Sequence, residues 1–163
     1  MAMLKIIRMQ KRDIFQAARI ASQCFSGMKD IRKARLWITC NFRAFPRARY
    51  FVAKDKARVI GYILWLEKGG FRKEAVLELE QIAVEPASQG QGVATQMIKD
   101  SLASIKKDLA KRGNRLKLVE ATTGAGNKAQ ELYKKTLGAR PVCVIKNLFR
   151  GDEVIMVSRQ IKS

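Results

Sequence analysis

The sequence predicts an α/β protein, a single domain over residues 1–163 built on a mixed β-sheet, and three observations support this. Apolar residues recur at helical spacing in four segments and dominate seven shorter, strand-like segments. Glycine, proline and polar turns separate most of these segments. No internal repeat, low-complexity run or linker divides the chain, and 163 residues suffice for one hydrophobic core. The expected order is β-α-α-β-β-β-α-β-α-β-β, with a sheet that is partly antiparallel at its start.

The amino-terminal part is expected to hold one strand and two helices. Residues 4–9 have the apolar content of a strand. Asp13 and Gln16 are predicted to form a capping box at the start of the first helix. A second helix is predicted over residues 30–45, before Pro46, because proline interrupts a helix. The side chains expected to face the core from this second helix are Ile31, Trp37, Ile38, Phe42 and Phe45.

The middle of the chain is expected to form a hairpin and then a longer strand. Residues 50–54 and 59–67 flank a polar turn at residues 55–57, which predicts an antiparallel pair. The longer strand covers residues 75–85 and ends at Pro86. The later elements are predicted as a helix over residues 92–112, a strand over 116–121, a helix over 128–136, and strands over 142–147 and 153–160.

Histidine is absent, and this excludes several kinds of catalysis. Ser-His-Asp and Cys-His mechanisms need an imidazole base, and His-containing zinc sites lose their ligand. Cys24, Cys40 and Cys143 offer no C-x-x-C pair, so no metal site is expected. Their odd number and wide spacing indicate reduced cytosolic thiols, which we expect to be buried as small apolar side chains.

The chain is strongly basic, with 33 Lys and Arg residues against 14 acidic residues and a net charge of +19. A positive field of this size attracts polyanions, so nucleic acid, ribosomes, an acidic protein and a phosphate-rich cofactor are all candidate partners. No apolar stretch approaches the roughly 18 to 20 residues that a membrane span requires, and the amino terminus shows no signal-peptide pattern. A cytoplasmic location without membrane contact is therefore expected.

The most informative segment is the glycine-rich turn at residues 89–95, between a strand and a helix. A helix start offers unpaired N–H groups and the positive end of a dipole, and both favour a bound anion. Gly90 and Gly92 lack side chains, so a pyrophosphate can approach the backbone closely. The turn has no Gly-Lys-Ser/Thr of a Walker loop, and Thr95 stands where G-x-G-x-x-G has its third glycine. The alternative is an ordinary glycine-rich connection.

The turn resembles the signature of the GNAT superfamily of acyl-CoA N-acyltransferases. Gln89-x-x-Gly92-x-Ala94 follows a strand that reads Glu-Gln-Ile-Ala-Val-Glu-Pro, and it is similar to the Q/R-x-x-G-x-G/A motif of that family. The order of elements also matches, so the resemblance covers nearly the whole chain.

A second block carries the same resemblance. Ala129-x-x-x-Tyr133, followed by residues 137–139 (Leu-Gly-Ala), is similar to the N-x-x-A-x-x-x-Y helix and L-G-F corner of the family. Two departures occur. The usual asparagine falls on Gly126, with Asn127 one place later, and one extra residue stands before the glycine.

The resemblance implies acetyl-CoA as cosubstrate and direct transfer of the acetyl group to an amine. Tyr133 then matches the tyrosine that protonates the leaving CoA thiolate; the alternative is an aromatic side chain packed beneath the sheet. The main chain of Ile82 and Val84 is implied to bind the pantetheine arm as an added strand. The other residues implied to contact the cofactor are Gln89, Gly90, Gln91, Gly92, Val93, Ala94, Thr95 and Asn127.

A carboxylate is expected to act as the base that deprotonates the amine. Glu80 is the first choice, because in a regular strand it shares a face with Glu78, Ile82 and Val84. The alternative is a structural carboxylate paired with one of the many lysines or arginines. Glu120 is the second candidate and Glu78 the third.

The acceptor is expected to meet the first two helices, as the resemblance implies. Basic side chains there favour an acidic protein or peptide as the amine acceptor, although charged runs are more often solvated surfaces. These side chains are Arg32, Lys33, Arg35, Arg43, Arg47 and Arg49. A second basic cluster, around residues 106–117, is a candidate contact for nucleic acid or the ribosome. The alternative function is a catalytically silent protein of the same fold that binds acyl-CoA or nucleic acid.

Overall fold

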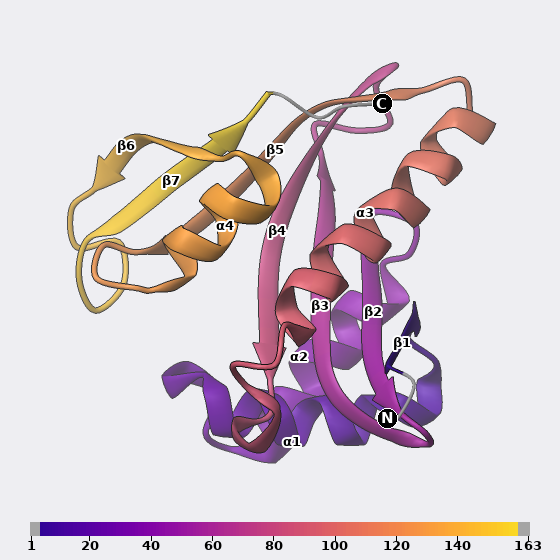
Figure 1. The fold of residues 1–163 in the computed structure, drawn as a ribbon, viewed down its shortest axis with the longest axis vertical. Helices are drawn as coiled ribbons and strands as arrows, with labels where there is room; N and C mark the ends of the chain where they lie inside the picture. The colour runs from indigo at the N-terminus through magenta and orange to yellow at the C-terminus, as the bar shows by residue number, and fades with distance from the viewer. Residues whose placement is uncertain (1–3, 160–163) are drawn as a thin grey trace. The chain divides into compact units, whose positions relative to one another are not determined.

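The computed structural model describes residues 4–159, and the predicted order of strands and helices is confirmed (Figure 1). None of the helices in this part of the chain is long and apolar enough to cross a membrane. The elements are β1 (Leu4–Arg8), α1 (Ile14–Cys24), α2 (Ile31–Arg43), β2 (Ala48–Asp55), β3 (Arg58–Lys68), β4 (Glu74–Val84), α3 (Val93–Lys111), β5 (Arg115–Gly124), α4 (Ala129–Leu137), β6 (Arg140–Ile145) and β7 (Glu153–Ser158).

Within residues 4–159, seven strands form one mixed sheet in the order β1-β2-β3-β4-β5-β7-β6. β4 and β5 pair in parallel, from Glu74 opposite Arg115 to Glu78 opposite Glu120. The pairs β1 with β2, β5 with β7 and β6 with β7 are antiparallel. The predicted fold class, an α/β protein with a mixed sheet, is thus confirmed.

The chain divides into two compact units. The first unit comprises the residues up to Trp65 together with Gln81–Ala103, and the second comprises Leu66–Glu80 and the residues from Ser104 onward. β3, β4 and α3 each contribute residues to both units. The units are therefore not consecutive stretches of chain, and one domain over residues 1–163 stays a prediction.

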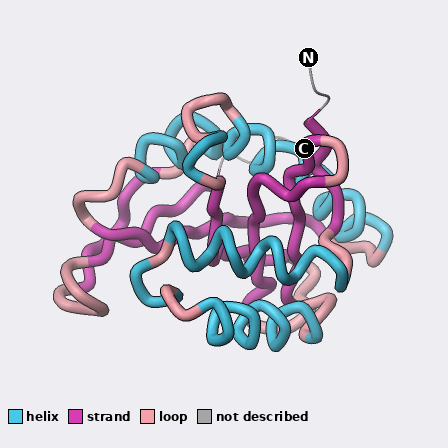
Figure 2. Tube along the Cα trace, turned by 90° about the horizontal axis from the view of Figure 1, so that it is seen from below, coloured by secondary structure: helices cyan, strands magenta, loops and turns pink. Residues whose placement is uncertain are grey.

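In the first unit, small residues allow α1 and α2 to lie side by side (Figures 1 and 2). Ala17 and Ala18 on α1 and Ala34 on α2 are fully buried, and small side chains allow helices to approach closely. Trp65 Nε1 in β3 donates a hydrogen bond to Ser101 Oγ in α3 at 2.8 Å, and both residues are fully buried. This bond satisfies the indole N–H and fixes α3 against the strand.

In the second unit, α4 packs on β5 and β7. The Ser158 hydroxyl of β7 donates to the carbonyl oxygen of Leu137, at the end of α4. The buried Glu67 of β3 accepts two hydrogen bonds from Arg112, at 2.8 and 2.9 Å. β6 lies at the edge of the sheet, and its side chains are exposed.

The predicted capping box at Asp13 and Gln16 is wrong. Asp13 accepts a hydrogen bond from the main-chain N–H of Gln10 at 2.9 Å and forms an ion pair with Lys54 at 2.6 Å. Gln16 instead accepts the main-chain N–H of Val59 at 2.9 Å. The side chains of Asp13 and Lys54 are only 2% and 10% exposed. A charge buried to this degree needs a partner, which Lys54 supplies. The capping box lies one turn earlier than predicted, with Gln10 as the N-cap and Asp13 as the third residue of the short 3-10 helix Lys11–Asp13.

α2 buries fewer large side chains than its spacing predicts. Ile38 is buried as expected, but Ile31 and Phe42 are half-buried. Phe45 and Trp37 are exposed, so their predicted core packing is wrong. Helical spacing identifies a face of a helix, but it does not show how wide a stripe of that face the neighbouring elements cover.

The expected burial of the three cysteines is also wrong, although all three are free thiols as expected. Cys24 is half-buried, and Cys40 and Cys143 are exposed. Apolar neighbours in the sequence do not fix which side of a helix or strand faces the core.

Candidate functional site

The turn after β4 is shaped by two glycines. Gly90 and Gly92 adopt φ values of 75° and 80°, a left-handed conformation that strains residues with a side chain. A Cβ added at either position would meet no heavy atom within 4 Å. Backbone conformation therefore favours glycine at both positions, and the space beside their main chain is open.

The helix that follows this turn directs its N-terminus to the open side. α3 starts at Val93, and its first hydrogen bond runs from the N–H of Gln96 to the carbonyl of Gly92 at 3.0 Å. The N–H groups of residues 93–95 therefore precede the helical ladder. Val93 is buried and residues 89–92 are exposed. The positive end of a 19-residue helix thus meets an exposed glycine turn, a geometry that suits a phosphate group.

Two glutamine side chains brace the turn. Gln89 Nε2 donates to the Val84 carbonyl oxygen at 2.9 Å, and Gln91 Nε2 donates to the Ala87 carbonyl oxygen at 3.1 Å. The thiol of Cys24 also donates to the Val84 carbonyl, at 3.4 Å, and burial raises the pKa of this thiol. Both glutamine side chains are therefore engaged in shaping the turn, and their predicted contact with a cofactor stays a prediction.

The end of β4 presents main-chain groups at one edge. The N–H of Glu85 donates to the carbonyl oxygen of Ile60 in β3 at 2.9 Å. Successive residues of a strand direct their main-chain groups to opposite edges, so those of Ile82 and Val84 point away from β3. Both residues also lie beyond the ladder of β4 with β5, which ends at Glu78. The predicted binding of the pantetheine arm by the main chain of Ile82 and Val84 stays a prediction.

Several residues that support the turn were not predicted. A Cβ at Gly61 in β3 would lie 2.9 Å from the carbonyl oxygen of Ala83, so glycine is needed for this close approach. Glu85 accepts from Arg58 at 2.7 and 2.8 Å and from Ser88 Oγ at 2.8 Å. A glycine inside a strand was an available signal for Gly61. The sequence offered no signal for the contact of Glu85 with Arg58, because the two residues lie 27 positions apart.

Tyr133 lies on the buried side of α4 in the second unit. It is 5% exposed, and burial raises the pKa of its phenol to about 12. Its hydroxyl has no hydrogen-bond partner within residues 4–159, so its proton is available to a ligand. The phenol is therefore a protonated donor at neutral pH.

Asn127 sets the start of α4. Its Oδ1 accepts the N–H of Ala129 at 2.9 Å, and its own N–H donates to the carbonyl of Gly124 at 2.9 Å. This is the geometry of a helix cap, in which a side-chain oxygen satisfies a free N–H group. The Asn127 side-chain nitrogen is free to meet a ligand, and its predicted cofactor contact stays a prediction.

Two of the three candidate bases share one lysine. Glu78 of β4 and Glu120 of β5 face each other in the ladder, and the ammonium of Lys68 contacts both. Its distance to Glu78 is 3.3 Å. The hydrogen bond to Glu120, followed by the charge of Glu78, raises the pKa of Lys68. Both carboxylates are therefore engaged with one lysine.

Glu80 lies two residues beyond this ion-pair cluster, and it is half-buried. Burial alternates along β4 from Glu74 to Glu80 and then ceases to alternate, because Gln81 and Ile82 are both half-buried and the last two residues of the strand are both buried. The expectation that Glu80, Ile82 and Val84 share one face is therefore not met by their burial. Across residues 4–159, no group of three or more His, Cys, Asp or Glu side chains forms a metal site.

Comparison with known proteins identifies the family. Residues 14–139 match the Acetyltransferase (GNAT) family, which is more than half of the chain. The chain belongs to this family. GNAT acetyltransferases use acetyl-CoA as their acyl donor. No curated protein matches the sequence.

Solved structures share the fold of this GNAT chain at low sequence identity. The ribosomal-protein-S18-alanine N-acetyltransferase from Escherichia coli is 20% identical with a TM-score of 0.71, over 99% of this chain and 97% of that one. The NatC complex bound to Gag peptide and CoA is 12% identical with a TM-score of 0.74, over 97% of this chain and 99% of that one. A mutant of spermidine N-acetyltransferase SpeG from Vibrio cholerae is 18% identical with a TM-score of 0.73, over 96% of this chain and 94% of that one. These likenesses establish the GNAT fold.

Proposed function

We propose that the chain transfers the acetyl group of acetyl-CoA to a primary amine by direct attack of the amine on the thioester. The observation that carries this proposal is the open turn at Gly90 and Gly92, in front of the N-terminus of α3. The pyrophosphate of CoA would accept hydrogen bonds from main-chain N–H groups of residues 89–95.

The pantetheine arm would extend along the end of β4 as an added strand. Main-chain groups of Ile82 and Val84 point away from β3 and supply the affinity in this mode of binding. The carbonyl oxygen of Val84 already accepts from Gln89 and Cys24. The arm would therefore depend more on the N–H of Val84 than on its carbonyl.

In the transfer step, the amine nitrogen forms a bond to the acetyl carbon and the bond between this carbon and sulfur breaks. CoA leaves as a thiolate, and the phenol of Tyr133 would donate a hydrogen bond to it. A phenol with a pKa of about 12 is a weaker acid than a thiol, whose usual pKa is about 8.5. The proton that finally neutralises the thiolate therefore originates from the attacking amine.

Glu80 remains the proposed base for the amine, directly or through water. Glu120 is the second candidate, and it is engaged in an ion pair with Lys68. The contacts of Glu78 with the same lysine place it third.

An acidic protein or peptide is the proposed class of acceptor. The basic side chains of α2 and of the loop that follows it attract negative charge. Arg49 is buried, so it is withdrawn from this set. The exposed members are Arg32, Lys33, Arg35, Arg43 and Arg47.

The test of the cofactor turn is thermal unfolding with acetyl-CoA, and with CoA and ATP as controls. A ligand at about a hundred times its Kd adds roughly 2.7 kcal/mol of stability. We expect acetyl-CoA to raise the melting temperature more than ATP does, since ATP measures the simple attraction of phosphates to a basic protein. The stabilised protein is then assayed for acetyl transfer to peptides with acidic amino-terminal sequences.

A pair of glycine variants makes this test specific. Gly92→Ala and Gly113→Ala alter the two ends of α3, at φ values of 80° and 71°, and both positions face open space. The strain of a side chain at positive φ is about 1–2 kcal/mol in each. Gly92→Ala is expected to lose the response to acetyl-CoA, whereas Gly113→Ala keeps it. Equal responses in both variants would reject the turn as the cofactor site, and acetyl-CoA binding without transfer to any amine would favour a silent binding protein.

A further inference from the structure

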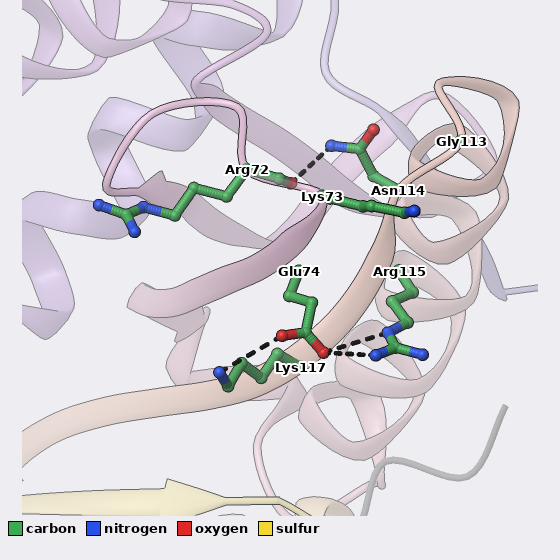
Figure 3. Close-up of a pocket in the computed structure, with 7 residues that line it drawn as sticks. All are labelled: Arg72, Lys73, Glu74, Gly113, Asn114, Arg115 and Lys117. Atoms are coloured by element: carbon green, nitrogen blue, oxygen red, sulfur yellow. Dashed lines mark hydrogen bonds and ion pairs between the residues drawn. The ribbon is translucent and has the colours of Figure 1, made fainter.

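A basic cleft lies in the second unit, where the loop between β3 and β4 meets the turn between α3 and β5 (Figure 3). Its volume is about 590 Å³. The charged side chains that line it are Arg72, Lys73, Arg115 and Lys117, with the carboxylate of Glu74. It shares no residue with the proposed cofactor turn.

The walls of this cleft are tied to each other. Asn114 Nδ2 donates to the carbonyl oxygen of Arg72 at 2.6 Å, and the N–H of Arg115 donates to the carbonyl oxygen of Lys73 at 2.8 Å. Both bonds join the β3–β4 loop to the start of β5. The cleft is thus formed before any ligand arrives, which lowers the entropic cost of binding.

Only part of the positive charge that lines the cleft is paired with a carboxylate of the protein. Glu74 accepts from Arg115 at 2.7 Å and lies 3.5 Å from the ammonium of Lys117 (Figure 3). Arg72 donates its Nε to the carbonyl of Gly69 at 2.7 Å, which leaves the two terminal nitrogens of its guanidinium for a ligand. The exposed ammonium of Lys73 has no partner in the described part of the chain. The side chains of Arg72 and Lys73 extend in opposite directions from the backbone and leave both charges available to solvent (Figure 3).

An exposed aromatic residue directly precedes these charged residues in the chain. Phe71 directly precedes Arg72 in the chain and is 60% exposed. The guanidinium of Arg112 lies over its ring at 4.9 Å, and Arg112 is fixed in turn by two hydrogen bonds to the buried Glu67. Phe71 is therefore held in place although it is exposed.

Basic side chains beside an exposed ring are the features by which proteins hold single-stranded nucleic acids. Phosphates lie along the charges, and a base stacks on the aromatic ring. An inorganic polyphosphate would use only the charges, and in a duplex the bases are already stacked on one another. The exposed ring of Phe71, one residue before Arg72, thus favours a single strand over both a polyphosphate and a duplex.

We propose that this cleft and the adjoining loop bind single-stranded nucleic acid, with one base stacked on Phe71 and two phosphates of the strand held by Arg72 and Lys73. Acetyl transfer is not required for this binding. RNA and DNA share the chemistry that the cleft recognises.

The test is fluorescence anisotropy of the full chain with labelled oligomers of about 10 nucleotides, within the range that one binding module covers. The oligomers are single-stranded RNA, single-stranded DNA and an abasic phosphodiester of the same length, each titrated over a series of salt concentrations. The base-bearing oligomers are expected to bind at least about fivefold more tightly than the abasic one. Preferential binding of RNA or of DNA would support the proposal and show which of the two nucleic acids is the ligand.

Two variants separate the charges from the ring. Arg72→Ala with Lys73→Ala should make the slope of log K against log salt less steep by about 1.4, or 0.7 for each phosphate contact. Phe71→Leu should weaken the binding of base-bearing oligomers at least about fivefold and leave the abasic oligomer unaffected. The control, Arg19→Ala with Lys99→Ala, removes the same charge from exposed positions of α1 and α3.

The proposal fails if the control pair weakens binding as much as the cleft pair, because the charge of the whole protein would then explain the affinity. It also fails if Phe71→Leu has no effect or affects the abasic oligomer equally. Melting temperatures of all variants show whether each one is folded under the conditions of the assay.

Discussion

The pKa of the Tyr133 phenol reports how strongly the fold isolates this group from water. Its pKa is raised from 10.0 to about 12 by burial, so the folded protein resists ionisation of this group. In the unfolded chain the phenol ionises near pH 10. A raised pKa contributes stability that is fully present below pH 10 and is lost as the pH rises through the folded value. Between pH 10 and 12 the loss is about 1.4 kcal/mol for each pH unit.

The comparison of wild type with Tyr133→Phe isolates this contribution, because the variant lacks the ionisable group and keeps the ring. The free energy of unfolding is measured with urea at pH 8 and at pH 11 for both proteins. The stability of wild type relative to the variant is expected to fall by about 1.4 kcal/mol between these two pH values. A relative stability that does not change would mean that the phenol ionises as readily in the folded state as in the unfolded state. The role of Tyr133 as a buried, protonated donor would then be refuted.

Three further predictions concern residues around the two candidate sites. Gly61→Ala should cost about 1–3 kcal/mol in urea unfolding, because its Cβ would lie 2.9 Å from a carbonyl oxygen of β4, whereas Gly27→Ala, with open space around it, should cost less than about 0.5 kcal/mol; equal costs would contradict the close approach. Asp13→Asn should cost about 3–5 kcal/mol in the same assay, since it leaves the charge of Lys54 buried without its partner, and a change below about 1 kcal/mol would show that the pair is not desolvated. Asn127→Ala should cost about 1 kcal/mol through the lost cap of α4, and a smaller rise of the melting temperature on addition of acetyl-CoA would in addition assign it a cofactor contact.

The order of the elements could be predicted because each has a local cause. Helical spacing marks α3, and Pro86 and Gly90 punctuate the passage from β4 into it. The glycine turn was predictable for the same reason, since the left-handed conformation of Gly92 leaves its mark on the residue type itself. Features set by the backbone of a short segment can therefore be predicted from the sequence.

Features set by contacts between distant segments were not predictable. The ion pair of Asp13 with Lys54 joins residues 41 positions apart, so no local pattern in the sequence indicates it. Lys68 bridges Glu78 and Glu120 only because the parallel register of β4 and β5 brings the two carboxylates opposite each other. No spacing within either strand carries that information, so the sequence could nominate the candidate bases but could not show that two of them contact the same lysine.

The three free thiols of the chain differ in a way that is useful for chemical labelling. Cys40 and Cys143 are exposed, and one lies in the first unit and the other in the second. Cys24 is half-buried, and its raised pKa keeps it as the unreactive thiol at neutral pH. A maleimide dye should therefore attach first to Cys40 and Cys143. The natural sequence thus already carries a donor and acceptor position for energy transfer, through which the distance between the units can be followed as acetyl-CoA or an oligonucleotide is added.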